Sequence, residues 1–189
     1  MKVVGFAGFS GTGKTTLLTQ LLPLLRAAGQ RVAVLKHAHH RFDIDQPGKD
    51  SWRHRQAGAF EVLVASDQRW VLMREHERAQ EPDIHQLLAQ FDASVDWVLV
   101  EGFKEAAIPK VEVWRPAAPG QPPRPLRYGG DACVVALATG SPADLPRPTA
   151  LPVFDLNAPQ AIAQWLLANA HRFGYRRPSA GAPYMETAR

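Results

Sequence analysis

A glycine-rich segment near the start of the chain, Gly8-Phe9-Ser10-Gly11-Thr12-Gly13-Lys14-Thr15, constrains the fold more than any other feature. Its two glycines, lysine and hydroxyl residue have the spacing of a phosphate-binding loop. The apolar residues 3–7 before it predict a buried strand, and leucines at helical spacing after it predict a helix. A strand, a glycine loop and a helix N-terminus together hold phosphate through backbone N–H groups and the helix dipole.

The residue types in this glycine loop, residues 8–15, suggest specific contacts. Glycine adopts backbone conformations that are closed to other residues, so successive N–H groups can point into one concavity. We expect the ammonium of Lys14 to reach the β- and γ-phosphates of a nucleotide, and the hydroxyl of Thr15 to coordinate Mg²⁺. By itself, the loop predicts only that the chain binds a nucleoside triphosphate.

Apolar runs of strand length alternate with helical patterns along the chain. Residues 14 to about 28 predict a helix that ends at Gly29, and residues 31–35 predict the strand that follows it. A crossover of this kind makes the two strands parallel. We therefore expect an α/β protein, a three-layer P-loop NTPase fold with a mainly parallel sheet. Further strands are expected near residues 96–101, 109–114, 132–138 and 151–156, with helices that begin near residues 82 and 157.

Two other segments depart from this alternation. Residues 60–65 and 70–73 are β-prone runs joined by a polar turn, which predicts an antiparallel hairpin. We expect this hairpin at an edge of the sheet, where antiparallel pairs in parallel sheets usually lie. Residues 116–125 are too proline-rich for regular structure and predict a loop or spacer.

The composition suits one nucleotide-binding domain. We expect that domain to span residues 1–171 of the 189, with residues 172–189 as an Arg- and Pro-rich, poorly ordered tail. No apolar run is long enough for a membrane span, Met1-Lys2 leads straight into a strand, and the single Cys133 cannot form an internal disulfide. These features predict a cytoplasmic protein. The net charge of +4 favours anionic partners, and either nucleotides or nucleic acid would satisfy it.

The polar segment after the second predicted strand should lie near the phosphates, because ligands bind at the carboxyl ends of parallel strands. It contains His37, His39, His40, Asp43 and Asp45. This cluster is compatible with a transition metal, although its spacing matches no standard zinc pattern. Binding a second anionic ligand, or completing the Mg²⁺ shell through an aspartate, is the preferred interpretation. The arginines of the following helix, Arg53 and Arg55, either contact phosphate or form a solvated basic face.

The predicted strand at residues 96–101 ends in a carboxylate, Glu101. Nucleotide hydrolases hold Mg²⁺ or its water shell with an acid in this position. Glycine at position 102 then lets the chain leave the strand close to a ligand. The chain has sixteen arginines but only six lysines. We expect the lysines that lie in loops or at strand ends to face the site. Besides Lys14 they are Lys36, Lys49, Lys104 and Lys110.

These segments together resemble one family closely, the MobB family of molybdopterin-guanine dinucleotide biosynthesis adapters. The resemblance covers residues 3 to about 167. It implies a GTP-binding protein with weak GTPase activity that acts as a homodimer. The partner would be a MobA-type nucleotidyltransferase, which joins GMP to molybdopterin. The segments that carry the resemblance are residues 8–15, Lys36-His37-Ala38-His39-His40, Pro47-Gly48-Lys49-Asp50-Ser51, Val100-Glu101-Gly102-Phe103-Lys104 and Pro109-Lys110-Val111-Glu112-Val113.

The resemblance also implies a role for individual residues. Lys14 and Glu101 would be the catalytic pair, with Thr15 and Glu101 at the magnesium ion. The partners would be GTP, Mg²⁺, the nucleotidyltransferase and molybdopterin or its guanine dinucleotide, with no nucleic acid and no membrane. The phosphate contacts would be Gly11, Thr12, Gly13, Lys14, Thr15 and Thr16, and the neighbouring anion site would be lined by Lys36, His39, His40, Arg53 and Lys104.

Two alternatives on the same scaffold stay open. One is a small-molecule kinase, whose acceptor would bind at the histidine segment. The other is a nucleotide-binding adapter that never hydrolyses. No Asn-Lys-x-Asp tetrad for guanine is present, although Thr139-Gly140-Ser141 and Asp144 occupy a comparable place. A preference for guanine therefore rests on the resemblance.

Overall fold

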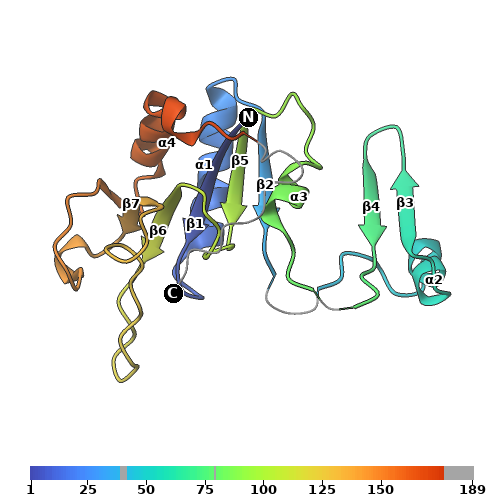
Figure 1. The fold of residues 1–189 in the computed structure, drawn as a ribbon, viewed down its shortest axis with the longest axis horizontal. Helices are drawn as coiled ribbons and strands as arrows, with labels where there is room; N and C mark the ends of the chain where they lie inside the picture. The colour runs from blue at the N-terminus through green and yellow to red at the C-terminus, as the bar shows by residue number, and fades with distance from the viewer. Residues whose placement is uncertain (39–41, 79, 177–189) are drawn as a thin grey trace. The chain divides into compact units, whose positions relative to one another are not determined.

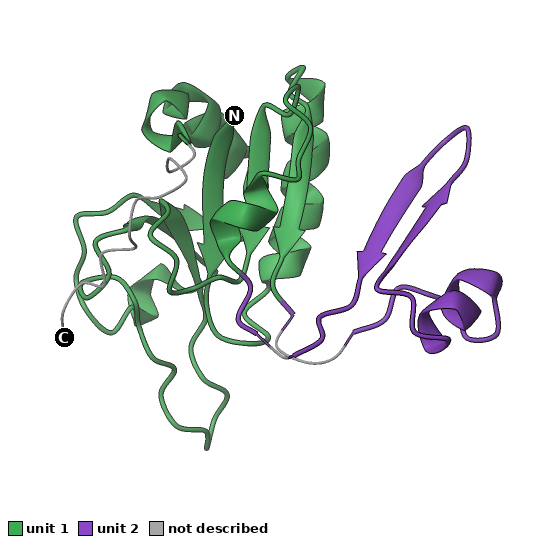
Figure 2. Cartoon of the chain, turned by 45° about the vertical axis from the view of Figure 1, so that its right-hand side comes forward, with its two compact units in different colours: residues 1–37, 83–189 green, residues 38–82 purple. Residues whose placement is uncertain are grey.

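The computed structural model describes residues 1–38, 42–78 and 80–176 of the chain. Contacts divide the chain into two compact units (Figure 2). Unit 1 consists of Met1–His37 and the chain from Asp83 onward, and unit 2 consists of Ala38–Pro82. The expected domain of residues 1–171 thus spans both units.

Unit 1 is built on a six-stranded sheet in which every neighbouring pair is parallel (Figure 1). The strand order is β2-β5-β1-β6-β7-β8, so β5 lies between the first two strands of the chain. The strands are β1 (Lys2–Ala7), β2 (Val32–Lys36), β5 (Trp97–Glu101), β6 (Lys110–Trp114), β7 (Val134–Thr139) and β8 (Val153–Asp155). The prediction of an α/β fold with a mainly parallel sheet is confirmed.

Helices cover both faces of this sheet and make three layers. On one face, Val4 and Phe6 of β1 are packed in a core cluster with buried residues of α1 (Lys14–Ala27) and α4 (Pro159–Ala168). On the other face, Val3 belongs to a second cluster, which contains Ile84 and Leu88 of α3 (Ile84–Leu88). The alternation of side chains along a strand explains this division. Two short 3₁₀ helices, η1 (Pro142–Asp144) and η2 (Ala170–Phe173), complete the unit.

Helix α1 connects the glycine loop to β2. It ends where expected, because Gly29 takes a left-handed φ of +76° just after the C-cap. Pro23 lies inside the helix and does not end it. Leu17, Leu21 and Leu25 are fully buried against the sheet. The glycine loop is thus held between a buried strand and a helix with a buried face.

Unit 2 contains α2 (Asp50–Gln56) and a hairpin of β3 (Glu61–Ala65) and β4 (Trp70–Arg74). The hairpin is antiparallel, as predicted, with Ser66 N donating to Arg69 O across the turn. Its expected place at an edge of the parallel sheet is wrong, because β3 and β4 form a two-stranded sheet of their own. Strand propensity predicts pairing within the hairpin but not which sheet it joins.

The start of the expected tail is an ordered part of unit 1. Phe173 is buried, Gly174 forms a bridge with Lys2, and Tyr175 N donates to Met1 O at 3.1 Å. These contacts extend ordered structure beyond residue 171, because an aromatic residue there covers the edge of the core. The rest of the expected tail, residues 177–189, lies outside the described residues. Of the helices in the described ranges, none is long and apolar enough to cross a bilayer.

Candidate phosphate-binding site

The candidate site lies at the carboxyl ends of the parallel strands, where ligands bind in open α/β sheets. The strand order sets the order of polar residues along this edge. Lys36 ends β2, Glu101 ends β5, the glycine loop follows β1, and Arg115 follows β6. The loop therefore has an acidic residue on one side and a basic residue on the other.

The backbone of the loop is shaped by its glycines. Gly11 and Gly13 have left-handed φ angles of +74° and +99°. Gly13 is also the N-cap of α1, and no side chain caps the helix there. The N–H groups of the first helical turn are therefore available to an anion. Gly8 lies so close to β6 that an added Cβ would be 2.2 Å from the carbonyl oxygen of Val113.

Thr12 is fully buried, and its hydroxyl donates to the carbonyl oxygen of Phe9 at 3.0 Å. The side chain of Thr12 thus stabilises the loop from within, and only its backbone could contact a phosphate. Thr16 is exposed on the first turn of α1.

Lys14 folds back over the loop. Its ammonium donates to the carbonyl oxygens of Gly8 at 2.9 Å and Phe9 at 2.8 Å. Burial lowers the pKa of Lys14, and Glu101 raises it, while the positive charges of Lys36 and Arg124 lower it. Several cations therefore converge on a partly buried place that has one carboxylate, an arrangement that favours binding of a polyanion.

Glu101 is held between the loop and β2. It is 8% exposed, and its Oε1 accepts a hydrogen bond from the Thr15 hydroxyl at 2.6 Å. The Nζ of Lys36 lies 3.7 Å from the same oxygen. Register explains this cluster, since Glu101 pairs with Phe6 of β1 and with Lys36 of β2. A hydroxyl and a carboxylate oxygen this close together are the donor types that Mg²⁺ prefers.

Gly102 permits the close approach of β2 and β5 just beyond this acid. Its φ is +92°, and an added Cβ would be 2.9 Å from the Cβ of His37. The ring of His37 stacks on Phe103 with 4.5 Å between centroids. His37 therefore packs beside the site and shapes the turn after Glu101.

The contacts of Lys104 and Arg53, two other predicted members of the anion site, are made with residues outside it, and their role there stays a prediction. Lys104 is exposed in the turn after β5, where its carbonyl oxygen accepts from Lys110 and Arg127. Arg53 belongs to unit 2, where its guanidinium lies 3.7 Å from Asp50 and 69% of its side chain is exposed. The predictions for His39 and His40 fall outside the described residues. Within the described ranges, no group of three or more His, Cys, Asp or Glu residues could hold a metal ion.

One of the expected site lysines is a core residue. Lys110 is 1% exposed, and its ammonium pairs with Asp131 at 2.8 Å and donates to Ala106 O at 2.7 Å. The expectation that Lys110 faces the site is therefore wrong. A buried ammonium is tolerated here because a carboxylate and two carbonyl oxygens surround it.

Arg55 fits neither of the two roles considered for it. It donates to both carboxylate oxygens of Asp43, at 2.8 and 3.0 Å, and lies 3.4 Å from Asp45. The Nε of Arg55 also lies 3.1 Å from Glu75. The bidentate geometry that could have bound phosphate is thus used within unit 2. The same contacts engage the aspartates that were considered for the Mg²⁺ shell, and Ser51 donates to Asp45 as well.

This ion pair gives a testable pH dependence. The hydrogen bonds from Arg55 hold the pKa of Asp43 at about 2, against an ordinary value of 3.8. Because the pKa is lowered on folding, the stabilisation is complete above pH 3.8 and is lost as the pH falls towards 2. In the variant Arg55→Gln, the pKa of Asp43 should rise towards its ordinary value, as measured by carboxyl NMR titration. Arg53→Gln, on the same helix, should leave the pKa of Asp43 unchanged.

An unchanged Asp43 titration in Arg55→Gln would contradict this assignment. The dispersion of the amide signals from β3 and β4 serves as the control that unit 2 remains folded in both variants.

Two residues near the loop are missed by sequence reasoning. The guanidinium of Arg115 lies 3.7 Å from the position of an added Cβ at Gly13. Arg124 lies over the ring of Phe9, with 5.7 Å from its guanidinium carbon to the centroid. Arg124 belongs to residues 116–125, the proline-rich segment that was predicted as a loop or spacer, and Arg115 directly precedes that segment. A lack of periodicity hides such residues, and their positive charge is the one signal that marks them.

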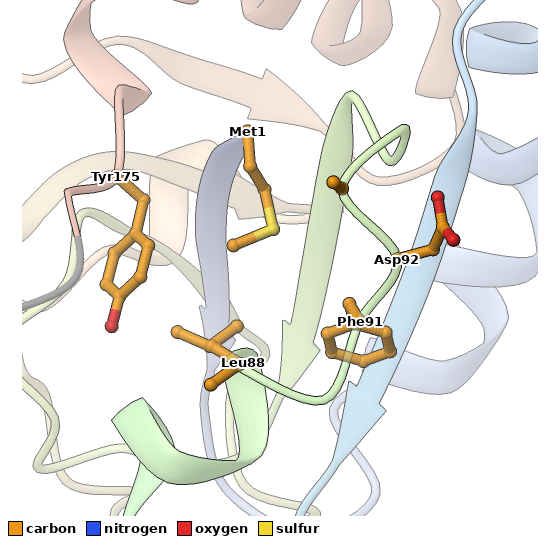
Figure 3. A pocket seen from close by; sticks show the side chains of 7 residues that line it. Met1, Leu88, Phe91, Asp92 and Tyr175 are labelled. Atoms are coloured by element: carbon orange, nitrogen blue, oxygen red, sulfur yellow. The ribbon is translucent and has the colours of Figure 1, made fainter.

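A small pocket lies at the opposite end of the sheet (Figure 3). It has a volume of about 230 Å³ and is lined by Met1, Leu88, Phe91, Asp92 and Tyr175, among others. The hydroxyl of Tyr175 lies 2.6 Å from Nδ1 of His85. Because Met1 precedes β1 and the glycine loop follows it, this pocket is separate from the candidate site.

The sheet is parallel, helices cover it, and a glycine loop joins its first strand to the first helix. These features together define the class of α/β proteins with a P-loop-like fold. Lysine, threonine and glutamate side chains meet at that loop. Comparison with known proteins narrows this class to one family.

The chain belongs to the MobB family. Residues 3–139 match the family model described as molybdopterin guanine dinucleotide synthesis protein B. The chain is 42% identical over 166 residues to the molybdopterin-guanine dinucleotide biosynthesis adapter protein of Escherichia coli (strain K12), a match that covers 87% of this chain and 91% of that protein. The adapter protein of Haemophilus influenzae is 40% identical over 172 residues, and this match covers 90% of each of the two chains.

Solved structures agree with this assignment. The crystal structure of Bacillus subtilis MobB superposes with a TM-score of 0.66 at 25% identity, and the match covers 89% of this chain and 97% of that chain. A MobB homologue from Bacillus stearothermophilus gives a TM-score of 0.62 at 25% identity, covering 90% and 99%. The resemblance stated from the sequence is confirmed.

Proposed function

We propose that this protein is a GTP-binding adapter in molybdopterin-guanine dinucleotide biosynthesis. It assists a MobA-type nucleotidyltransferase, which joins GMP to molybdopterin. The proposal of nucleotide binding rests on one observation, the hydrogen bond from Thr15 to Glu101 beside the Lys14 ammonium. The names of the relatives from Escherichia coli and Haemophilus influenzae support the adapter part.

The donor atoms at the loop fit a magnesium nucleotide. The N–H groups at the start of α1 have no side-chain cap, and Gly11 and Gly13 add the turn that exposes them. Phosphate oxygens would accept from Lys14 in place of the carbonyl oxygens of Gly8 and Phe9. Thr15 and Glu101 would hold Mg²⁺, which neutralises charge on the β- and γ-phosphates when bound.

The same residues support slow hydrolysis. Glu101 has one oxygen on Thr15 and Lys36, so the carboxylate is fixed in orientation. It would accept a hydrogen bond from the attacking water or from a metal-bound water. Lys14 would stabilise charge that develops on the γ-phosphate during in-line attack. Lys36 extends the positive field away from the phosphates, towards a second anionic ligand such as molybdopterin.

We further propose a homodimer in which the hairpin of unit 2 takes part. Leu63 and Leu72 are cross-strand partners, and Ala65 and Trp70 form the next pair on the same face. Leu63 is 61% exposed and Trp70 is 68% exposed. Isolated two-stranded hairpins are marginally stable in water, so a second apolar surface over this face would stabilise it.

One experiment tests whether the protein binds GTP and whether it hydrolyses the nucleotide. Mg-GTP and Mg-ATP would compete for a fluorescent guanine nucleotide on the purified protein, and release of phosphate would be followed with and without a MobA-type partner. GTP should displace the probe at lower concentration than ATP. The variant Glu101→Gln should lose hydrolysis by about 100-fold, because the carboxylate that orients water is gone.

The outcomes separate the alternatives. If ATP displaces the probe better than GTP, the guanine assignment is wrong. Activation of the partner that survives in Glu101→Gln would favour an adapter without turnover. Rapid transfer of labelled phosphate to molybdopterin would instead indicate a kinase.

A further inference from the structure

Residues 115–126, here called the arginine segment, begin beside the glycine loop and are fixed at their far end. The buried carboxylate of Glu112 in β6 accepts backbone hydrogen bonds from Arg127 at 2.9 Å and Tyr128 at 2.8 Å. The side chain of Arg127 also pairs with Glu105 at 2.6 Å. The segment is therefore a loop that leaves the end of β6 and is held at its far end by Glu112 of the same strand.

Two arginines of this segment lie on the glycine loop. The Nε and Nη2 atoms of Arg115 lie 3.7 Å from the Cβ position of Gly13, directly before Lys14. Arg124 lies over the ring of Phe9, a residue that is 54% exposed, and its Nη1 donates to the carbonyl oxygen of Arg115 at 3.5 Å. Arg124 thus connects the segment both to the loop and to its own first residue.

In the described ranges, neither guanidinium is neutralised by a carboxylate. In the part of the chain that the structure describes, no ion pair joins Arg115 or Arg124 to a carboxylate. Arg115 is exposed and Arg124 half-buried. Guanidinium groups that have solvent access and no carboxylate partner among the described residues favour a ligand that carries negative charge and a planar ring.

The strand order indicates which end of a bound nucleotide Arg115 and Arg124 would face. Glu101 and its hydrogen-bonded partner Thr15 mark the β5 side of the loop as the place of the terminal phosphates and Mg²⁺. Arg115 follows β6, on the other side of β1. A nucleotide whose terminal phosphate lies at Glu101 must extend its nucleoside away from that acid, and β6 is the strand on that side.

We propose that Arg115 contacts the nucleoside of the bound nucleotide, with its guanidinium plane stacked on the base, and that Arg124 positions the segment through Phe9. This inference rests on the proposed function, since it needs a nucleotide in the loop. Guanidinium planes stack on base rings, and the contact needs both the plane and the charge.

The test compares three ligands with Mg²⁺ by calorimetry: GTP, GDP and inorganic tripolyphosphate, which lacks a nucleoside. Arg115→Ala should weaken GTP and GDP binding by a similar factor of about tenfold and leave tripolyphosphate within about twofold of wild type. Arg115→Lys keeps the charge without the plane and should recover only a small part of the loss. Arg26→Ala, an exposed arginine in the last turn of α1, is the control for removal of positive charge.

Each other outcome overturns the inference. An equal loss for tripolyphosphate would make Arg115 a phosphate ligand, and a loss for GTP but not GDP would place it at the γ-phosphate. Full recovery in Arg115→Lys would exclude stacking, and no change in Arg115→Ala would exclude contact. If the wild-type chain bound none of the three ligands, the proposed function itself would fail.

Discussion

Replacing Lys14 with alanine is expected to weaken binding of a magnesium nucleoside triphosphate by about 100-fold, or about 3 kcal/mol. The ammonium is held over the loop by two carbonyl oxygens and is already partly desolvated. Its removal therefore takes away charge-assisted hydrogen bonds for which little further desolvation is needed. Calorimetric titration of Mg-GTP into wild type and variant measures the effect.

Arg26→Ala is the matched control, because it removes a cation from the far end of α1. Its affinity for Mg-GTP should equal that of wild type, and circular dichroism should show that Lys14→Ala keeps its helix content. A Lys14→Ala variant that bound Mg-GTP as tightly as Arg26→Ala would remove the glycine loop from the proposed function.

Gly8→Ala should lower the free energy of unfolding by about 3 kcal/mol. The added Cβ would be 2.2 Å from the carbonyl oxygen of Val113, which belongs to the backbone of β6 and cannot rotate away. Either the loop or the strand must move, and β6 is buried along its whole length within the sheet. Urea denaturation followed by tryptophan fluorescence gives the difference in stability.

The control for this substitution is Gly29→Ala. Gly29 has a φ of +76° but no atom within 4 Å of an added Cβ, so only the backbone strain is changed and about 1 kcal/mol should be lost. Equal losses at the two positions would mean that close packing against β6 contributes nothing.

Local features of this chain could be predicted because short-range physics determines them. The apolar residues before the glycine loop have no alternative to burial, and the leucines after it define one helix face. Glu101 could be identified because an acid at the end of an apolar strand needs a partner. The structure supplies that partner in Thr15.

Long-range pairing could not be predicted in the same way. The insertion of β5 between β1 and β2 depends on contacts between residues far apart in sequence. The burial of Lys110 depends on Asp131, which the sequence places in an unremarkable turn. Arg115 and Arg124 meet the loop because Glu112 fixes the end of their segment, and no periodic pattern marks that contact.

The buried Lys110 also links two positions of the chain. It is paired in register with Gly5 of β1, and a Cβ at position 5 would be 2.7 Å from its Cγ. A side chain at position 5 and a long side chain at position 110 therefore exclude each other. Evolution can therefore place a side chain at position 5 only if the side chain at position 110 also becomes shorter, so a change at position 5 should be accompanied by a change at position 110.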